Sequence, residues 1–98
     1  MIHDLPVTAG QAGVCLSISY NGYRRIVEIH AVGRTKAGHK VMRVWQVRGG
    51  SSSGVNQGWK LMRLDQIESM SLTEERAQVP RDGYRRGDKA MAQITWQI

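Results

Sequence analysis

The stretch that decides the fold is VCLSISYNG, residues 14–22, in which apolar side chains alternate with small ones before an Asn-Gly pair. Alternation with a period of two is typical of a half-buried β-strand. Asn21 and Gly22 form the pair preferred in two-residue hairpin turns, because both adopt positive φ at low cost. We therefore expect a hairpin whose second strand covers residues 23–32. The residues expected to share one face of that second strand are Val27, Ile29 and Ala31.

Three more strands are expected farther along the chain, over residues 39–48, 59–64 and 67–72. In the first of these, Met42, Val44 and Gln46 should face opposite Arg43, Trp45 and Val47, because successive strand residues point to opposite faces. Alternation returns at Ile94, Trp96 and Ile98, after a turn signal at residues 80–83 and an Asp88 placed to cap a short helix.

These elements predict a mainly β fold. Short strands joined mostly by tight turns favour a small antiparallel β-barrel of about five strands, with a short helix or turn at one or both ends. Gly10 and Gly13 leave room for at most one short helix before the first strand. The 98 residues suffice for a single domain that buries about two-thirds of the surface of its unfolded chain.

The single cysteine, Cys15, has no partner for an internal disulfide and suggests a reducing compartment. The first residues show no basic segment followed by an apolar one, and no window approaches the length of a membrane span. We therefore expect a cytoplasmic protein that does not contact a membrane.

The net charge of +6 is distributed unevenly. Residues 22–64 contain nine basic residues and one acid, Glu28, whereas residues 65–75 contain four acids and no base. A regional excess of positive charge suits a polyanionic partner, although a solvated basic surface is about as common an explanation.

Catalysis is not indicated. His3, His30 and His39 lack the spacing of metal ligands with Cys15 or with each other, so we expect no metal site. The serines of residues 51–53 have no nucleophile-elbow sequence around them, and the acids of residues 65–75 are explained by a solvated edge. We expect neither an enzyme nor a cofactor.

Three arginines, Arg25, Arg43 and Arg63, come from three different predicted strands. A guanidinium can bind phosphate oxygens through two hydrogen bonds and can stack on a base. We expect the fold to bring these three side chains together at one patch of the surface.

The aromatic candidates for stacking on a base are Tyr20 and Trp59. The chain has no phenylalanine, so core packing is the favoured explanation for Trp45 and Trp59, with stacking on a base as the alternative. The glycine-rich residues 49–54 offer Ser51 and Ser52 to an anion, but they lack the Gly-Lys-Ser ending of a P-loop and also suit a flexible connection.

From about residue 14 to residue 75 the chain resembles a WYL domain, a small Sm/SH3-like β-barrel of prokaryotic regulators and defence-associated proteins. The best match is KLMRLDQI, residues 60–67, followed by ISY at 18–20 and RIVEI at 25–29; KVM at 40–42 replaces the name-giving triplet. The resemblance implies binding of nucleotide signals or single-stranded nucleic acid, with matching residues at Tyr20, Arg25 and Arg63 and with Lys60 as a weaker substitute for the family's arginine. Residues 76–98, beyond the resemblance, are expected to form a basic tail that packs on or extends the barrel.

The sequence thus predicts a non-enzymatic module that recognises a nucleotide second messenger or a short single strand, by resemblance in a phage or defence setting. The alternative is a protein-interaction module that docks on an acidic partner or self-associates into a homo-oligomer, as an anti-defence inhibitor or a regulator subunit. The same positive charge supports both interpretations.

Overall fold

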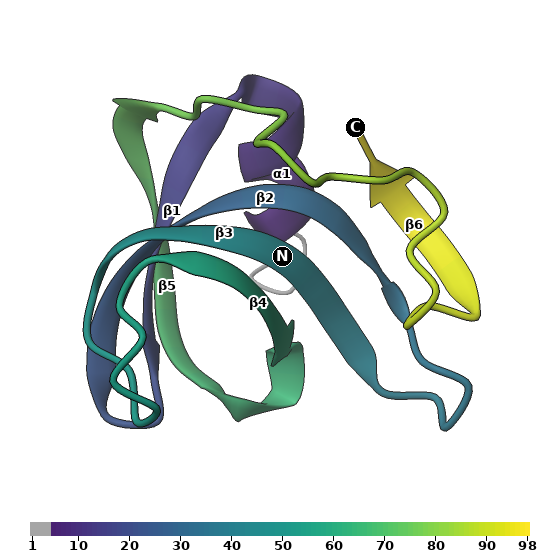
Figure 1. Cartoon of the computed structure of the whole chain (residues 1–98), viewed down its shortest axis with the longest axis horizontal. Helices are drawn as coiled ribbons and strands as arrows, with labels where there is room; N and C mark the ends of the chain where they lie inside the picture. The colour runs from purple at the N-terminus through teal and green to yellow at the C-terminus, as the bar shows by residue number, and fades with distance from the viewer. Residues whose placement is uncertain (1–4) are drawn as a thin grey trace.

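The computed structural model describes residues 5–98, which form a short helix and a sheet of six strands (Figure 1). In chain order the elements are α1 (Leu5–Ala12), β1 (Val14–Tyr20), β2 (Tyr23–Arg34), β3 (Lys40–Gly49), β4 (Gly58–Arg63), the 3-10 turn η2 (Leu64–Gln66), β5 (Ile67–Arg76) and β6 (Gln93–Gln97). None of the helices within residues 5–98 has the length and apolar character needed to cross a membrane.

All strand pairs in the sheet are antiparallel, in the order β4-β3-β2-β1-β5, with β6 added to the far end of β2. The mainly β, antiparallel prediction is therefore confirmed. The long strands β2 and β3 bend strongly, as Figure 1 shows. Within residues 5–98, however, no ladder joins β4 to β5, so the sheet is open rather than a closed barrel.

The predicted hairpin is present. Tyr20 pairs with Tyr23 across a two-residue turn in which Asn21 and Gly22 both have positive φ, 53° and 76°. These are the residue types that reach this conformation with least steric cost, so the turn fixes the register of β1 against β2.

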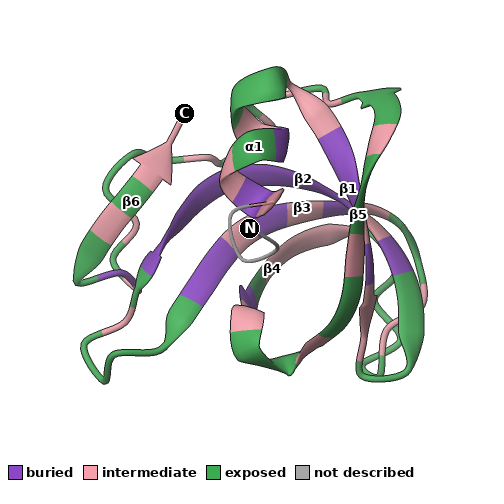
Figure 2. Cartoon of the chain, turned by 180° about the vertical axis from the view of Figure 1, so that it is seen from behind, coloured by how far each residue is buried: buried purple, intermediate pink, exposed green. Residues whose placement is uncertain are grey.

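The main core lies on the inner face of the sheet. Alternate residues of β1 to β4 point there, most of them buried, and α1 contributes Ala9. Figure 2 shows the buried stretches of these elements. The buried members of this core are Ala9, Leu16, Ile18, Val27, Ile29, Val32, Met42, Val44 and Met62. Each fully buried aliphatic side chain of this size contributes about 1.5–3 kcal/mol, so this face supplies most of the stabilisation.

The expectation that Ala31 shares a face with Val27 and Ile29 is wrong. The register between β2 and β3 shifts between Ile29 and Ala31, and an extra residue in one strand reverses the alternation beyond it. Ala31 belongs instead to a second, smaller cluster on the outer face, together with Val41, Met91 and Ile94.

Residues 77–92, here called the strap, connect β5 to β6 and lie against the outer face of β2 and β3. The short helix expected after Asp88 does not form. The Asp88 side chain accepts a hydrogen bond from the Ala90 amide, but only one turn follows, closed by the Met91 amide. The reason is that the Ala92 amide already donates to the backbone oxygen of Arg34 of β2, so the chain leaves the turn and enters β6. The Asp88 carboxylate is also bound to Arg43 of β3.

Candidate functional site

A cleft of about 570 Å³ lies between Trp59 of β4, Arg43 of β3 and the strap. Its lining consists of two aromatic rings, two glycines, four cationic side chains and one carboxylate. These residues are Arg43, Trp59, Gly83, Tyr84, Arg85, Arg86, Gly87, Asp88 and Lys89. An open hollow with this composition can take a ligand that carries both a flat ring and negative charge.

The two rings of the cleft are held by neighbours on the outer face. The indole Nε1–H of Trp59 donates to the backbone oxygen of Asp82 at 3.0 Å. The rings of Trp59 and Tyr84 lie 6.4 Å apart with planes 29° from parallel, while His30 meets Trp59 edge-on at 4.6 Å. Trp59 is therefore oriented before any ligand arrives, and a pre-oriented ring loses little freedom on binding.

Arg43 reaches the cleft as half of an ion pair. Its Nε–H and NH2 groups donate to the two carboxylate oxygens of Asp88 at 2.6 and 3.2 Å. The side chain of Asp88 is only 10% exposed, and the hydrogen bond from Arg43 lowers the pKa of Asp88 below its ordinary value. Arg43 thus positions the strap, and most of its charge is already neutralised.

Three other cations of the cleft remain without a carboxylate. Arg85, Arg86 and Lys89 are all exposed, and none forms an ion pair with a residue of the described range 5–98. They are free to bind phosphate groups, and their proximity raises the local concentration of anions.

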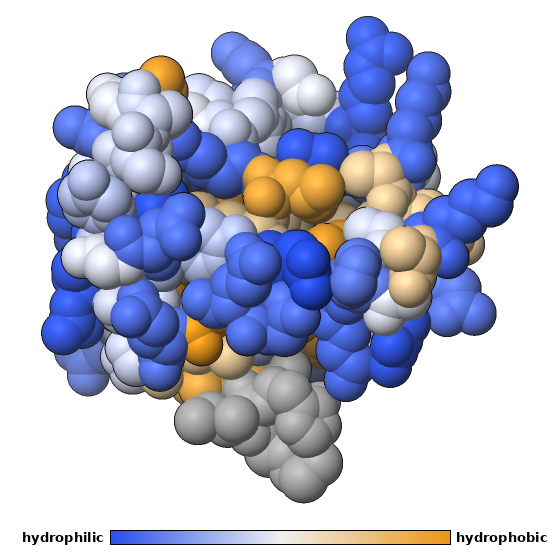
Figure 3. All heavy atoms as spheres, turned by 90° about the horizontal axis from the view of Figure 1, so that it is seen from below, coloured by the Kyte–Doolittle hydropathy of each residue, from blue (hydrophilic) through white to orange (hydrophobic). Residues whose placement is uncertain are grey.

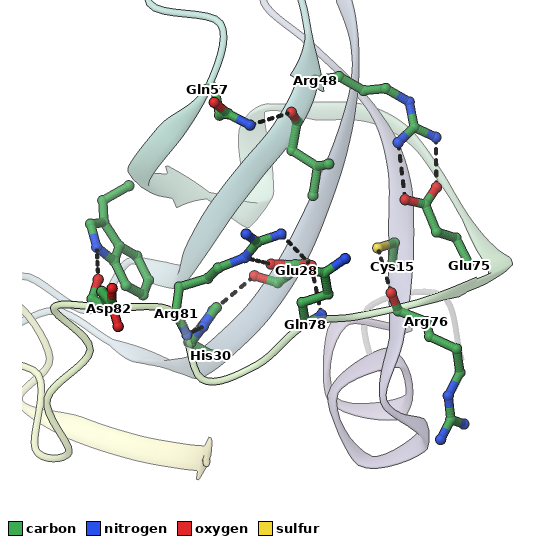
Figure 4. Close-up of polar contacts among 12 residues, drawn as sticks. Cys15, Glu28, His30, Arg48, Gln57, Glu75, Arg76, Gln78, Arg81 and Asp82 are labelled. Atoms are coloured by element: carbon green, nitrogen blue, oxygen red, sulfur yellow. Dashed lines mark hydrogen bonds and ion pairs between the residues drawn. The ribbon is translucent and has the colours of Figure 1, made fainter.

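A buried polar anchor fixes the wall of the cleft to the sheet (Figure 4). Glu28 of β2 accepts hydrogen bonds from Nε and NH2 of Arg81 at 2.7 and 3.1 Å and from the Gln78 amide at 2.7 Å. The guanidinium of Arg81 also lies 5.4 Å from the ring centre of Trp45. Burying Glu28 without these donors would be costly, so its burial requires the strap to be in place.

Arg25, a predicted ligand residue, is not available at the surface. It is 3% exposed, lies between the rings of Tyr20 and Tyr23, and donates to Gln46 Oε1 and to the backbone oxygen of Tyr20. Burial lowers the pKa of Arg25. Arg25 and Tyr20 therefore pack the polar end of the inner face.

Lys60, Ser51 and Ser52 lie near the long loop between β3 and β4. Lys60 Nζ donates to Ser51 Oγ at 3.2 Å and to the backbone oxygen of Val55 at 2.8 Å, which folds the loop back on β4. Gln46 Nε2 donates to two further backbone oxygens of this loop, those of Gly50 and Asn56. Ser52 is exposed. The loop is thus tied to the sheet at several points.

The expected convergence of the three arginines is not found among the residues that the structure describes. Arg25 is buried at the polar end of the inner face, Arg43 pairs with Asp88 in the cleft, and Arg63 pairs with its near neighbour Asp65 at 2.7 Å. The physical reason is that each arginine binds a different acceptor in a different part of the fold. These acceptors are Gln46 for Arg25, Asp88 for Arg43 and Asp65 for Arg63. Of the eight predicted ligand residues, the cleft contains Arg43 and Trp59.

Sequence reasoning missed the contribution of the strap to this site. Tyr84, Arg85, Arg86 and Lys89 follow one another closely, and an aromatic residue among bases is a signal that was available. This stretch faces Trp59, which lies more than twenty residues earlier in the chain. That proximity depends on contacts such as the Trp59–Asp82 hydrogen bond, which no local sequence pattern indicates.

Among residues 5–98 no group of three or more His, Cys, Asp or Glu side chains is placed to hold a metal ion, and His3 lies outside that range. Comparison with known proteins adds no further guide to the site. No protein-family model matches the sequence, and no curated protein or solved structure matches it. The resemblance to WYL domains therefore stays a prediction.

Proposed function

We propose that this protein is a non-enzymatic module that binds a nucleotide-type signal or a short single-stranded nucleic acid in the cleft between β4 and the strap. The observation that carries the proposal is the proximity of Trp59 and Tyr84 to three cations, Arg85, Arg86 and Lys89, that form no ion pair with any residue from 5 to 98.

This arrangement suits the two chemical parts of a nucleotide. Stacking of a base on an aromatic side chain contributes about 1–3 kcal/mol and works with any base, because each has a π-face. Exposed arginines bind phosphate through paired N–H donors and release counterions as they do so. The rings provide a platform for the nucleobase, and the neighbouring basic side chains of the strap provide the phosphate contacts.

The proposal retains only part of the site expected from the sequence. Trp59 keeps its role as stacking platform, and Arg43 acts through Asp88 by holding the strap in position. We assign no direct ligand contact to Arg25, because its guanidinium is covered by Tyr20 and Tyr23.

The test is a titration of the full chain with single nucleotides, cyclic dinucleotides and fluorescent dT oligomers at several salt concentrations. The double variant Arg85→Ala/Arg86→Ala should weaken binding severalfold. For a single strand, the slope of log K against log[salt] should fall by roughly 0.7 for each lost phosphate contact.

A matched control removes the same charge elsewhere. Arg24 and Lys36 are exposed cations outside the cleft, so Arg24→Ala/Lys36→Ala has the same net charge as the test variant. If the two double variants bind equally weakly, general charge and not the cleft is responsible. Binding of no probe by the unaltered protein overturns the proposal.

The second candidate function is self-association through the sheet edges. In the described chain β4 pairs only with β3 and β5 only with β1, so each leaves one edge open. Leu61 on β4 and Leu72 on β5 are 39% and 44% exposed, and unpaired strands with apolar side chains can pair with another chain. The two edge strands differ in charge, because β4 carries Lys60 and Arg63 while β5 carries Glu68, Glu74 and Glu75 besides Arg76. Of these, Arg63 and Glu75 already form ion pairs with Asp65 and Arg48.

Figure 3 shows hydrophobic side chains only in small groups among hydrophilic ones, which argues against a large apolar docking surface on that face. Light scattering over a wide concentration range decides between the two functions. Self-association predicts a mass that rises with concentration and that Leu61→Lys abolishes, whereas the cleft proposal predicts ligand binding that this variant leaves intact.

The proposal includes a partly open, Sm/SH3-like arrangement of the strands, the WYL relationship and the cytoplasmic location expected from the sequence. The strand order and the 3-10 turn between β4 and β5 support the architecture. A phage or defence setting rests on the resemblance alone.

A further inference from the structure

His30 lies at the interface between the sheet and the strap, and its side chain is completely buried. Nδ1 is 3.1 Å from the backbone oxygen of Glu28, and Nε2 is 3.1 Å from the backbone nitrogen of Arg81 (Figure 4). A carbonyl oxygen can only accept and a backbone N–H can only donate. The ring must therefore carry its proton on Nδ1 and accept at Nε2, which is a neutral imidazole.

Protonation of this ring is incompatible with the arrangement. An imidazolium has an N–H on both nitrogens, so Nε2–H would point at the Arg81 N–H and the hydrogen bond between strap and sheet would be lost. The cost of placing a charge in a buried site adds to that loss. Burial accordingly lowers the pKa of His30 below its ordinary value.

The surroundings of His30 do not offer a free counter-charge. Glu28, the neighbouring carboxylate on β2, already accepts three hydrogen bonds from Arg81 and Gln78. From the strap, the guanidinium of Arg81 opposes a second positive charge, and the Tyr84 ring lies 5.2 Å away. β4 presents the Trp59 ring. At the end of the chain the Ile98 amide binds the His30 backbone oxygen, while the Ile98 oxygen accepts from the Tyr84 hydroxyl.

The hydrogen bond from Arg81 to His30 belongs to the same short stretch that forms the cleft. The next residue, Asp82, accepts the Trp59 indole N–H, and Tyr84 is both a ring of the cleft and the donor of an amide hydrogen bond to the Arg81 backbone oxygen. Loss of the Arg81–His30 hydrogen bond therefore removes one of the contacts that hold the backbone supporting both rings.

We propose that His30 is a pH-sensitive lock on the cleft: the neutral ring holds residues 81–84 in the binding arrangement, and protonation releases them and weakens ligand binding. The ligand-binding half of this inference rests on the function proposed for the cleft. The sign is fixed by linkage, because ligand binds the form that lacks the proton, so affinity falls as the pH falls through the pKa of His30.

The experiment follows the full chain between pH 7.5 and 4.5 by NMR, first without ligand. The signals to observe are the ring nitrogens of His30, the Arg81 amide and the Trp59 indole N–H. At pH 7.5 the ring should show the Nδ1–H neutral form. On acidification the three sites should change with one common midpoint below the ordinary histidine pKa of about 6.5.

The second measurement is the affinity for a fluorescent dT oligomer without a terminal phosphate, because its phosphodiesters do not titrate in this range. Affinity should fall over the same pH interval by about 5-fold or more, the lower end of usual couplings between two sites. His39→Gln removes an exposed histidine and should leave the pH dependence unchanged, whereas His30→Gln should abolish it.

The outcomes separate the two proposals. An Arg81 amide that ignores the titration of His30, or a ring in the Nε2–H form at neutral pH, overturns the lock even if His30→Gln fails to fold. Binding that is independent of pH while His30 titrates also overturns it. If neither the oligomer nor any nucleotide probe binds at pH 7.5, the proposed function fails, and the lock on the strap is then judged by the Arg81 and Trp59 signals alone.

Discussion

The two faces of β2 bury their side chains equally well by different means. On the inner face Val27 and Ile29 pack among apolar side chains, and on the outer face Glu28 and His30 are just as inaccessible beneath the strap. Burial on the inner face needs only the right spacing of apolar residues. Burial on the outer face needs polar partners from a segment about fifty residues away. We therefore expect a change of charge to release the strap while the inner core persists.

The largest effect is expected from a cavity in the inner face. Ile29→Ala removes a buried side chain from the main core and should lower the free energy of unfolding by about 2–5 kcal/mol in urea denaturation. The exposed Leu72→Ala is the control and should change it little. A loss below 1 kcal/mol for Ile29→Ala would contradict the assignment of this face as the main source of stability.

The next effect belongs to the outer face. Glu28→Gln keeps the shape but removes the charge that Arg81 binds, and should cost about 2 kcal/mol. Hydrogen exchange should accelerate at the amides of Gln78 and Arg81 while the hairpin of β1 and β2 stays protected. Uniform acceleration throughout the sheet would show that the strap and the inner core are one cooperative unit.

A smaller, pH-dependent effect is expected at the other end of the strap. Asp88→Asn loses the ion pair with Arg43 and should cost about 1 kcal/mol at pH 7. Because the folded-state pKa of Asp88 is lowered, its stabilising contribution is present above the unfolded value of about 3.9 and disappears as the pH falls through the folded value. Chemical denaturation of the unaltered protein and of Asp88→Asn at pH 7 and at pH 3 measures this contribution. A difference that persists undiminished at pH 3 rules out the carboxylate as its cause.

The smallest effect is expected at Arg63, which pairs with Asp65 on the surface. Exposed pairs of this kind contribute little, so Arg63→Ala should leave the thermal midpoint and the affinity for dT oligomers essentially unchanged. This variant sharpens the comparison, because the sequence assigned Arg63 to the ligand site and the structure places it with another partner. A severalfold loss of affinity in Arg63→Ala would show that Arg63 does contact the ligand.

The inner face was predictable because its information is local. Alternation in residues 14–20 and the Asn21-Gly22 turn gave the first hairpin, and the inward positions Met42, Val44 and Gln46 followed from the same rule. The exception, Ala31, required knowledge of a bulge in the pairing with β3. The placement of each arginine depended on which acceptor it meets in the fold. Arg43 with Asp88 and Arg81 with Glu28 are contacts across 45 and 53 positions that no periodicity encodes.

The measurement that most directly tests the central claim is an NMR titration of the full chain with a dT oligomer at pH 7.5. The cleft proposal predicts that the Trp59 indole N–H and the amides of residues 83–89 shift most. It also predicts that signals from Arg25 and from the loop at residues 50–57 move little. Shifts confined to Arg25 and that loop, or no shifts at millimolar ligand, would contradict the account.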